Sequence, residues 1–321
     1  MADLAIETEN LTKIYGETRA VDGIDLAIPQ GGVHGFLGPN GAGKTTTIRM
    51  LATLIKPDSG TARVLGFDTE KQADEVRSRV SLTGQFASVD EDLPGRDNLR
   101  LLAKLYGYSG SAANARADEL LEAFGLTDAA TRPVKKYSGG MRRRIDICAS
   151  IVVTPELLFL DEPTTGLDPR SRNEVWDVIR TMVDYGTTVL LTTQYLDEAD
   201  QLADRISVID TGKVIAEGSS TELKASVGSG TVHVRVMHHD DRDAAREILT
   251  RELGTEVELS NDPQALVANV SATGRVTRAI TALETADIAL AQFSLGQPTL
   301  DEVFLALTGK HAETNDEEAA A

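Results

Sequence analysis

The chain has 321 residues, 41% of them hydrophobic, which is enough for one large packed domain and a smaller one. Its formal net charge of −18 at pH 7 argues against a general nucleic-acid binder, because phosphate contacts need clustered lysine and arginine side chains. The single cysteine, Cys148, excludes an intramolecular disulfide, and no stretch approaches the roughly 20 apolar residues of a membrane helix. Without a secretory signal pattern at the N-terminus, we expect an intracellular protein.

Short apolar runs alternate with helical patterns through the first two thirds of the chain, which predicts an α/β domain with a parallel sheet. The runs 157–160 and 189–191 are continuous, as in strands covered on both faces. Residues 206–209 and 214–216 resemble a hairpin that closes this domain. Strand patterns disappear between about residues 86 and 150, where we expect a helical insertion. The first domain is therefore expected over residues 1–225.

A second, smaller domain is expected over residues 230–309. It follows a run of small residues at 226–230, after which the patterns read strand, helix, strand, strand, helix, strand. This order predicts a small α+β unit of ferredoxin-like type, with a final helix near residues 301–307. The acidic, alanine-rich end over residues 310–321 is predicted to be disordered.

A glycine-rich segment follows the apolar run 33–37 and precedes a helical pattern. Glycines let successive backbone N–H groups face one concavity, and the helix adds the positive end of its dipole. The segment reads Gly38, Pro39, Asn40, Gly41, Ala42, Gly43, Lys44, Thr45 and Thr46. These residues predict a phosphate-binding loop, in which Lys44 reaches the outer phosphates of a nucleotide and the Thr45 hydroxyl ligates Mg²⁺.

Two carboxylates, Asp161 and Glu162, follow the buried run 157–160. Ligand sites of open α/β sheets lie at the carboxyl ends of the strands. Alone, two acidic residues after a strand more often begin an ordinary loop, but the phosphate-binding loop reverses that preference. We therefore assign Asp161 to the metal side of the site and Glu162 to the role of general base toward water.

A third motif, Ser138-Gly139-Gly140, precedes a helix with apolar periodicity. Ser138 suits the N-cap, and the glycines allow a backbone approach to an anion. With this motif the chain resembles the ATP-binding subunits of ABC transporters, in which Ser-Gly-Gly of one subunit closes on ATP held by the phosphate loop of another. The basic run Arg142 to Arg144 is interpreted as a solvated or intersubunit face.

The resemblance covers essentially the whole chain and implies further site residues. Tyr15 matches the aromatic residue that stacks on adenine. Gln85 matches the glutamine that contacts Mg²⁺ beside Thr45 and Asp161 and links the core to the helical insertion. Asp168 matches the loop that crosses the dimer interface.

Gln194 stands where most family members have a histidine after the last core strand. Glutamine can donate a hydrogen bond to the γ-phosphate, but it has no titratable proton near neutral pH. Two interpretations stay open: the change handicaps the site, or it is neutral because Glu162 still supplies the base. Together with the Ser-Gly-Gly segment and the terminal stretch 298–304, Gln194 makes the chain similar to ATPases of the daunorubicin and doxorubicin resistance exporters.

The resemblance implies an ATPase whose two copies, expected as a homodimer, enclose two Mg-ATP molecules head to tail. It also implies a separately encoded transmembrane permease, a peripheral place on the cytoplasmic face of the cell membrane, and export of a drug-like or lipid-like compound. Two alternatives remain. One is a soluble ABC ATPase that acts on ribosomes or DNA, which the acidic charge disfavours. The other is a regulator that closes on ATP but hardly hydrolyses it.

Overall fold

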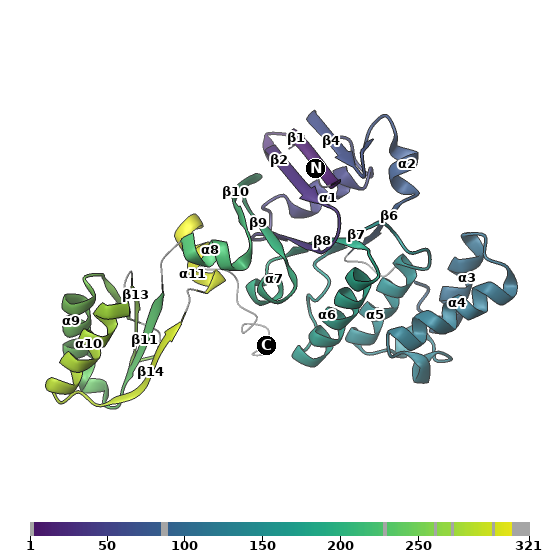
Figure 1. Cartoon of the computed structure of the whole chain (residues 1–321). Helices are drawn as coiled ribbons and strands as arrows, with labels where there is room; N and C mark the ends of the chain where they lie inside the picture. The colour runs from purple at the N-terminus through teal and green to yellow at the C-terminus, as the bar shows by residue number, and fades with distance from the viewer. Residues whose placement is uncertain are drawn as a thin grey trace. The chain divides into compact units, whose positions relative to one another are not determined.

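The computed structural model describes residues 3–84, 89–226, 230–259, 262–270, 273–296 and 299–309, which fall into two compact units (Figure 1). The second unit begins at Gly218, before the boundary expected at residue 225. The reason is that α8 (Ser220–Ser226) packs against α11 (Leu300–Thr308) and so belongs to the second unit. Gln85, Pro298 and the expected tail at 310–321 lie outside the described residues.

A six-stranded sheet forms the centre of the first unit. Its order is β10 (Lys213–Gly218), β9 (Arg205–Asp210), β3 (Val33–Leu37), β8 (Thr188–Thr193), β7 (Leu157–Asp161) and β6 (Val80–Thr83). Strand β3 pairs in parallel with β8 and β9, and β7 pairs in parallel with β6 and β8. Every residue of β3, β7 and β8 is buried, which confirms that these strands are covered on both faces.

Alternate side chains of β7 enter two different hydrophobic clusters. Leu157 and Phe159 join the cluster of α1 (Lys44–Leu51) and the N-terminal strands. Leu158 and Leu160 join the cluster of α5 (Gly139–Ser150) and α6 (Pro169–Asp184). Figure 1 shows these two groups of elements on opposite sides of the sheet. The period of two therefore persists in a strand whose residues are all apolar up to Asp161.

An antiparallel sheet at the N-terminus was not predicted from the sequence. Its order is β2 (Thr18–Pro29), β1 (Leu4–Tyr15), β4 (Ser59–Val64) and β5 (Phe67–Asp68). The register between β1 and β2 shifts between Thr8 and Leu11, so the alternation of buried and exposed residues breaks inside the strand. The pairing of β1 with the distant β4 also leaves no local signal.

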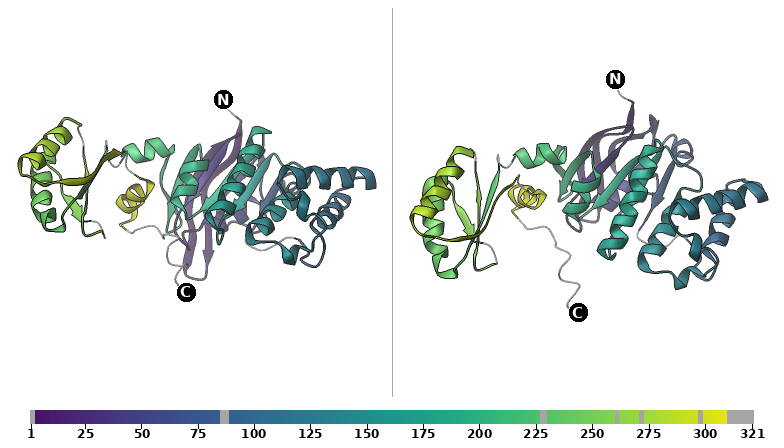
Figure 2. Two further views of the ribbon diagram at one scale, coloured as in Figure 1. Left: turned by 90° about the horizontal axis from the view of Figure 1, so that it is seen from below. Right: turned by 60° about the horizontal axis from the view of Figure 1, so that its bottom comes forward.

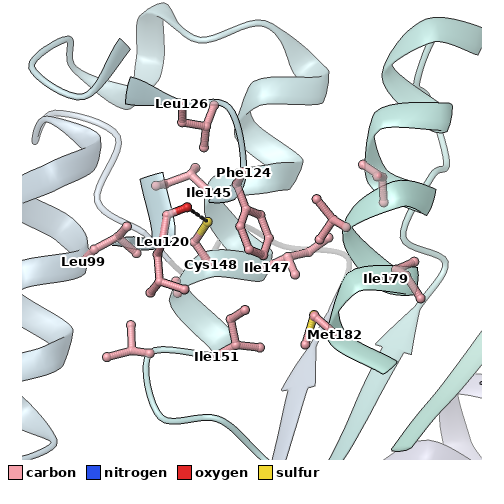
Figure 3. Close-up of a cluster of buried hydrophobic side chains, with 14 of the residues drawn as sticks. Leu99, Leu120, Phe124, Leu126, Ile145, Ile147, Cys148, Ile151, Ile179 and Met182 are labelled. Carbon is pink, nitrogen blue, oxygen red and sulfur yellow. Dashed lines mark hydrogen bonds between the residues drawn. The ribbon is translucent and has the colours of Figure 1, made fainter. Parts of the chain in front are cut away.

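The expected helical insertion contains α3 (Gly95–Leu105), α4 (Gly110–Ala123) and α5, with short 3-10 turns at Thr127–Ala129 and Val134–Lys136. The remaining helices of the first unit are α2 (Ala73–Arg77) and α7 (Leu196–Leu202). Cys148 of α5 is fully buried among apolar side chains, with its Sγ 3.9 Å from the carbonyl oxygen of Leu120 (Figure 3). Burial raises the pKa of the Cys148 thiol, which disfavours the reactive thiolate, so Cys148 is a core residue.

The second unit contains β11 (Thr231–Val236), α9 (Arg242–Leu253), β12 (Val257–Leu259), β13 (Ala265–Asn269), α10 (Thr273–Thr285) and β14 (Leu290–Gly296), with a 3-10 turn at His239–Asp241. Its antiparallel sheet has the order β12, β13, β11, β14. Helices α9 and α10 cover one face of this sheet (Figure 2). This is the order of elements expected for a ferredoxin-like unit. Within the described ranges of both units, no helix has the length and apolar character needed to cross a membrane.

Candidate nucleotide-binding site

The glycine-rich segment forms the loop between β3 and α1, as predicted. Gly43 has a φ of 105°, and a Cβ atom there would overlap the carbonyl oxygen of Ala20. A Cβ atom on Gly38 would overlap the carbonyl oxygen of Ile209. Glycine is therefore required at both positions. The loop borders a cavity of about 370 Å³, lined by Tyr15, Ala20, Pro39, Asn40, Gly41, Ala42, Gly43, Lys44, Thr45, Thr46 and Glu162.

Lys44 lies at the start of α1 with only 4% of its surface exposed. Its Nζ donates to the carbonyl oxygens of Gly38, at 2.6 Å, and Pro39, at 3.1 Å. The same Nζ lies 3.4 Å from Oε1 of Glu162. A buried ammonium group surrounded by oxygen atoms suits a phosphate ligand, which offers the same kind of acceptor together with negative charge.

Thr45 and Asp161 are brought together from α1 and the end of β7. The Thr45 hydroxyl donates to Oδ1 of Asp161 at 3.1 Å, and Asp161 is 4% exposed. A hydroxyl and a carboxylate oxygen beside a phosphate cradle are hard ligands of the kind that Mg²⁺ takes, usually with phosphate oxygens and water. The residues present therefore fit Mg²⁺. The third predicted ligand, Gln85, cannot be placed because it lies outside the described residues.

Thr192, at the end of β8, was missed by sequence reasoning. Its hydroxyl donates to Oδ1 of Asp161 at 2.6 Å. Its carbonyl oxygen and its Oγ1 each lie 3.1 Å from the backbone nitrogen of Glu162. Thr192 thus orients both acidic residues of the site. One sequence signal could have found Thr192: it follows the buried run 189–191, and neighbouring parallel strands end at the same edge of a sheet.

Glu162 follows β7 in an unusual backbone conformation, with a φ of 48°. This left-handed conformation is costly for a residue other than glycine and persists where the surroundings enforce it, as at many functional sites. Oε2 of Glu162 accepts a bond from the Thr165 hydroxyl at 3.4 Å. The Glu162 carboxylate lines the cavity beside Lys44. A general base that accepts a proton from the water attacking the γ-phosphate would have to lie there.

Gln194 follows β8 at the same sheet edge. The residue before it, Thr193, accepts a hydrogen bond on its carbonyl oxygen from the backbone of Gly38 at 3.2 Å. Oε1 of Gln194 is buried without a hydrogen-bond partner among the described residues. Buried amide groups are normally paired, so this one has capacity for a ligand or a water molecule.

Tyr15 lines the cavity with 51% of its surface exposed. Lys13 Nζ lies 5.7 Å from the centre of its ring. An exposed aromatic ring at the edge of a phosphate cradle offers a surface on which a base can stack.

The Ser-Gly-Gly motif begins α5 and does not line this cavity. Oγ of Ser138 accepts from the backbone of Met141 at 3.3 Å, which confirms the predicted N-cap. A Cβ atom on Gly140 would overlap Oγ of Ser171. Ser171 in turn donates from its hydroxyl to Asp168 at 2.6 Å, and this bond is the first cause of the lowered pKa of Asp168. The motif is therefore linked to Asp168 through Ser171, and neither is part of the cavity lining.

The basic run is interpreted from the sequence as a solvated or intersubunit face, but two of its side chains form neither, because they bond groups within their own chain. Arg144 donates to the carbonyl oxygen of Phe124 at 2.8 Å and pairs with Glu174 at 3.1 Å. Arg143 donates to backbone carbonyl oxygens inside the first unit. Both side chains are turned inward because helix ends and strand ends nearby present acceptors.

Fold and site together define a P-loop nucleotide-binding protein. The family model described as "ABC transporter" matches residues 21–165. The daunorubicin/doxorubicin resistance ATP-binding protein of Streptomyces peucetius is 59% identical over 99% of this chain and 96% of its own length. The chain therefore belongs to the ABC transporter ATPases.

Solved structures agree with this assignment. The cbiO1 protein of Clostridium perfringens, part of an ABC transporter complex, matches with a TM-score of 0.65 and 26% identity over 70% of this chain and 91% of its own. A dimeric ATP-binding cassette in a post-hydrolysis state, bound to ADP and phosphate, matches with a TM-score of 0.61 and 25% identity over 67% of this chain and 98% of its own.

Proposed function

We propose that this chain is the ATP-hydrolysing subunit of an exporter, in which two copies enclose two Mg-ATP molecules head to tail and drive a separately encoded transmembrane permease. The observation that carries the proposal is the division of the predicted site. Lys44, Thr45 and Glu162 line one cavity and Asp161 bonds Thr45, whereas the Ser138 to Gly140 segment is not part of the cavity lining. A second subunit supplies what the first lacks.

The residues at the cavity account for hydrolysis. Lys44 exchanges its contact with Glu162 for the γ-phosphate, and this exchange leaves the Glu162 carboxylate available to accept a proton from the attacking water. Thr45 and Asp161 would hold Mg²⁺, with Gln85 as the third ligand that the family resemblance implies. When bound, Mg²⁺ neutralises charge that develops on the phosphate oxygens. Gln194 orients the γ-phosphate or the water through its amide group.

The start of α5 is suited to bind the phosphate of a nucleotide that a second subunit holds. Ser138 caps the helix through Met141, and Gly139 leaves room for a close approach of phosphate to the backbone N–H groups of the first turn. The positive end of the helix dipole adds attraction for the γ-phosphate. Hydrolysis removes this shared ligand, so the pair reopens and the motion passes to the permease.

The substrate class rests on similarity alone. The relative from Streptomyces peucetius is named for daunorubicin and doxorubicin resistance. We infer that this chain supports export of a drug-like or lipid-like compound, with selectivity residing in the permease. The same reasoning gives a peripheral place on the cytoplasmic face of the cell membrane and a homodimer as the working unit.

The full-length chain, with and without its permease, should hydrolyse ATP in a Mg²⁺-dependent manner. Glu162→Gln should lower kcat by at least about 100-fold because the amide cannot accept the proton, while Mg-ATP binding persists. Binding is measured with a fluorescent ATP analogue and turnover by phosphate release. Wild-type turnover no higher than that of Glu162→Gln, even with the permease, would identify a nucleotide-dependent regulator instead.

A further inference from the structure

Arg143 of α5 donates to three backbone carbonyl oxygens in two separate segments of the chain. Its Nε bonds Pro163 O at 2.8 Å, its Nη1 bonds Gly84 O at 2.8 Å, and its Nη2 lies 3.3 Å from Asp161 O. Gly84 directly precedes Gln85, and Pro163 directly follows Glu162. One side chain therefore joins the helix that begins with the Ser-Gly-Gly motif to the backbone on both sides of the catalytic carboxylate.

The charges of three buried carboxylates act on the Arg143 guanidinium. Burial lowers the pKa of Arg143, whereas the nearby charges of Asp146, Glu198 and Asp161 raise it. Asp146 is 6% exposed, and Glu198 is fully buried. A guanidinium that is compensated by charge and bonded to carbonyl oxygens makes strong, directional hydrogen bonds, because its donors have a fixed planar geometry.

The geometry of these bonds distinguishes Arg143 from its neighbours in the basic run. Arg142 bonds Lys135 O at 2.7 Å, within the helical insertion, and Arg144 bonds Phe124 O there too. Arg143 alone of the three reaches the carboxyl end of β7. Arg143 is not among the residues that line the cavity, and its hydrogen bonds go to the neighbours of Glu162, so it acts on the reaction through the segments that it holds.

We propose that Arg143 is a positioning residue for ATP hydrolysis that fixes the start of α5 relative to the backbone of Asp161 and Pro163. The Ser138 to Gly140 segment contacts the nucleotide of the second subunit, and Asp161 and Glu162 act on the chain's own nucleotide. Arg143 fixes the position of the first relative to the second. This inference rests on the proposed function. It predicts that loss of Arg143 disturbs turnover far more than nucleotide binding, because the three hydrogen bonds of Arg143 hold residues 84, 161 and 163 rather than the phosphate-binding loop.

Arg143→Gln is the main variant, Arg143→Lys is the conservative one, and Arg116→Gln is the matched control. Arg116 of α4 also donates to backbone carbonyl oxygens, those of Ile151 and Val152, each at 3.0 Å, but outside the cavity lining. With full-length protein, Arg143→Gln should lower kcat at least about tenfold and change the Kd for Mg-ATP less than about threefold. Arg143→Lys keeps the charge but not the planar fork, so it should recover part of kcat.

Two results would overturn the proposal. One is a folded Arg143→Gln protein with kcat within about twofold of wild type. The other is a parallel loss of kcat and Mg-ATP affinity, equal to that of Arg116→Gln, which indicates a structural role only. Failure of the proposed function looks different, since wild-type turnover would then equal that of Glu162→Gln.

Hydrogen exchange tests Arg143 without relying on turnover. Arg143→Gln should speed amide exchange over residues 139–145 and 161–167, whereas Arg116→Gln should leave both stretches as in wild type. If Arg143→Gln fails to fold, amide exchange over the same two stretches is measured on Arg143→Lys, and faster exchange than in wild type supports the proposal. Unchanged exchange in these two stretches would contradict the proposal even if the wild-type protein did not hydrolyse ATP.

Discussion

The two halves of the site differ in how they are built. At the carboxyl edge of the central sheet, Lys44, Asp161 and Glu162 already contact other residues of the site within the chain. At the start of α5, Ser138 uses its hydroxyl to cap the helix, and the glycines line no part of the nucleotide cavity. The first half is preorganised for phosphate and the second for contact with something outside the chain. This difference is what a nucleotide shared between two subunits requires.

The largest expected effect comes from the cavity half. Lys44→Ala removes the buried ammonium group that faces the phosphates and leaves Glu162 without this cation. We expect kcat/KM to fall at least about 100-fold and Mg-ATP affinity to fall with it. Titration with a fluorescent ATP analogue measures the affinity. Wild-type affinity in Lys44→Ala would contradict the assignment of the phosphate-binding loop.

A change in the second half should separate binding from turnover. A Cβ atom on Gly139 meets only Leu167 Cδ2, at 3.7 Å, so an aspartate fits there, and its charge suits the first turn of α5. Gly139→Asp should therefore fold and bind Mg-ATP normally. Its carboxylate would repel the phosphate of the second subunit, so kcat should fall at least about 100-fold. Gly139→Asn is the uncharged control, and an equal loss in both would argue against electrostatic repulsion.

A smaller effect is expected at Gln194, which tests the cavity half again. Gln194→Ala removes the amide group whose Oε1 is buried and should lower kcat about tenfold, measured by phosphate release. Gln194→His then decides between the two interpretations of this residue. A many-fold rise above wild type would indicate a handicapped native site, whereas unchanged turnover would indicate a neutral substitution. Wild-type kcat in Gln194→Ala would exclude any role for the side chain.

The smallest effect concerns the cap of α5. Ser138→Ala removes the hydroxyl that accepts from the Met141 backbone. We expect the free energy of unfolding to fall by about 1 kcal/mol, measured by urea denaturation, because a backbone N–H loses its capping partner. Mg-ATP binding by the cavity half should stay at the wild-type level. A loss of affinity in this variant would show that the two halves are not separate.

The sequence predicted the parts of the site that lie in contiguous motifs. The loop from Gly38 to Thr46 and the pair after β7 each combine a local pattern with a strand end, so their place could be inferred. Thr192 and Arg143 were missed because their roles depend on contacts between distant segments. Arg143 did carry a weak signal. It shares a helix face with the buried Gly140 and Ile147, three residues before it and four after it.

The fold shows the same division between local and distant information. The continuous apolar strands and the helical insertion were predicted because their patterns are local. The N-terminal antiparallel sheet was not, because β1 pairs with β4 across the intervening β2, β3 and α1 and changes register along its length. Such pairing is determined by tertiary packing rather than by the residues of either strand alone.

The central claim is that one working site combines halves of two chains, and mixing two inactive variants tests it most directly. In a mixed dimer of Lys44→Ala and Gly139→Asp, one site receives Lys44 from one chain and an intact Ser138 to Gly140 segment from the other. Random pairing should restore about a quarter of wild-type turnover, since half of the dimers are mixed and each holds one intact site. Lys44→Ala mixed with Glu162→Gln should restore none, because both changes lie in the same half. A Lys44→Ala and Gly139→Asp mixture as inactive as either variant alone would contradict the account.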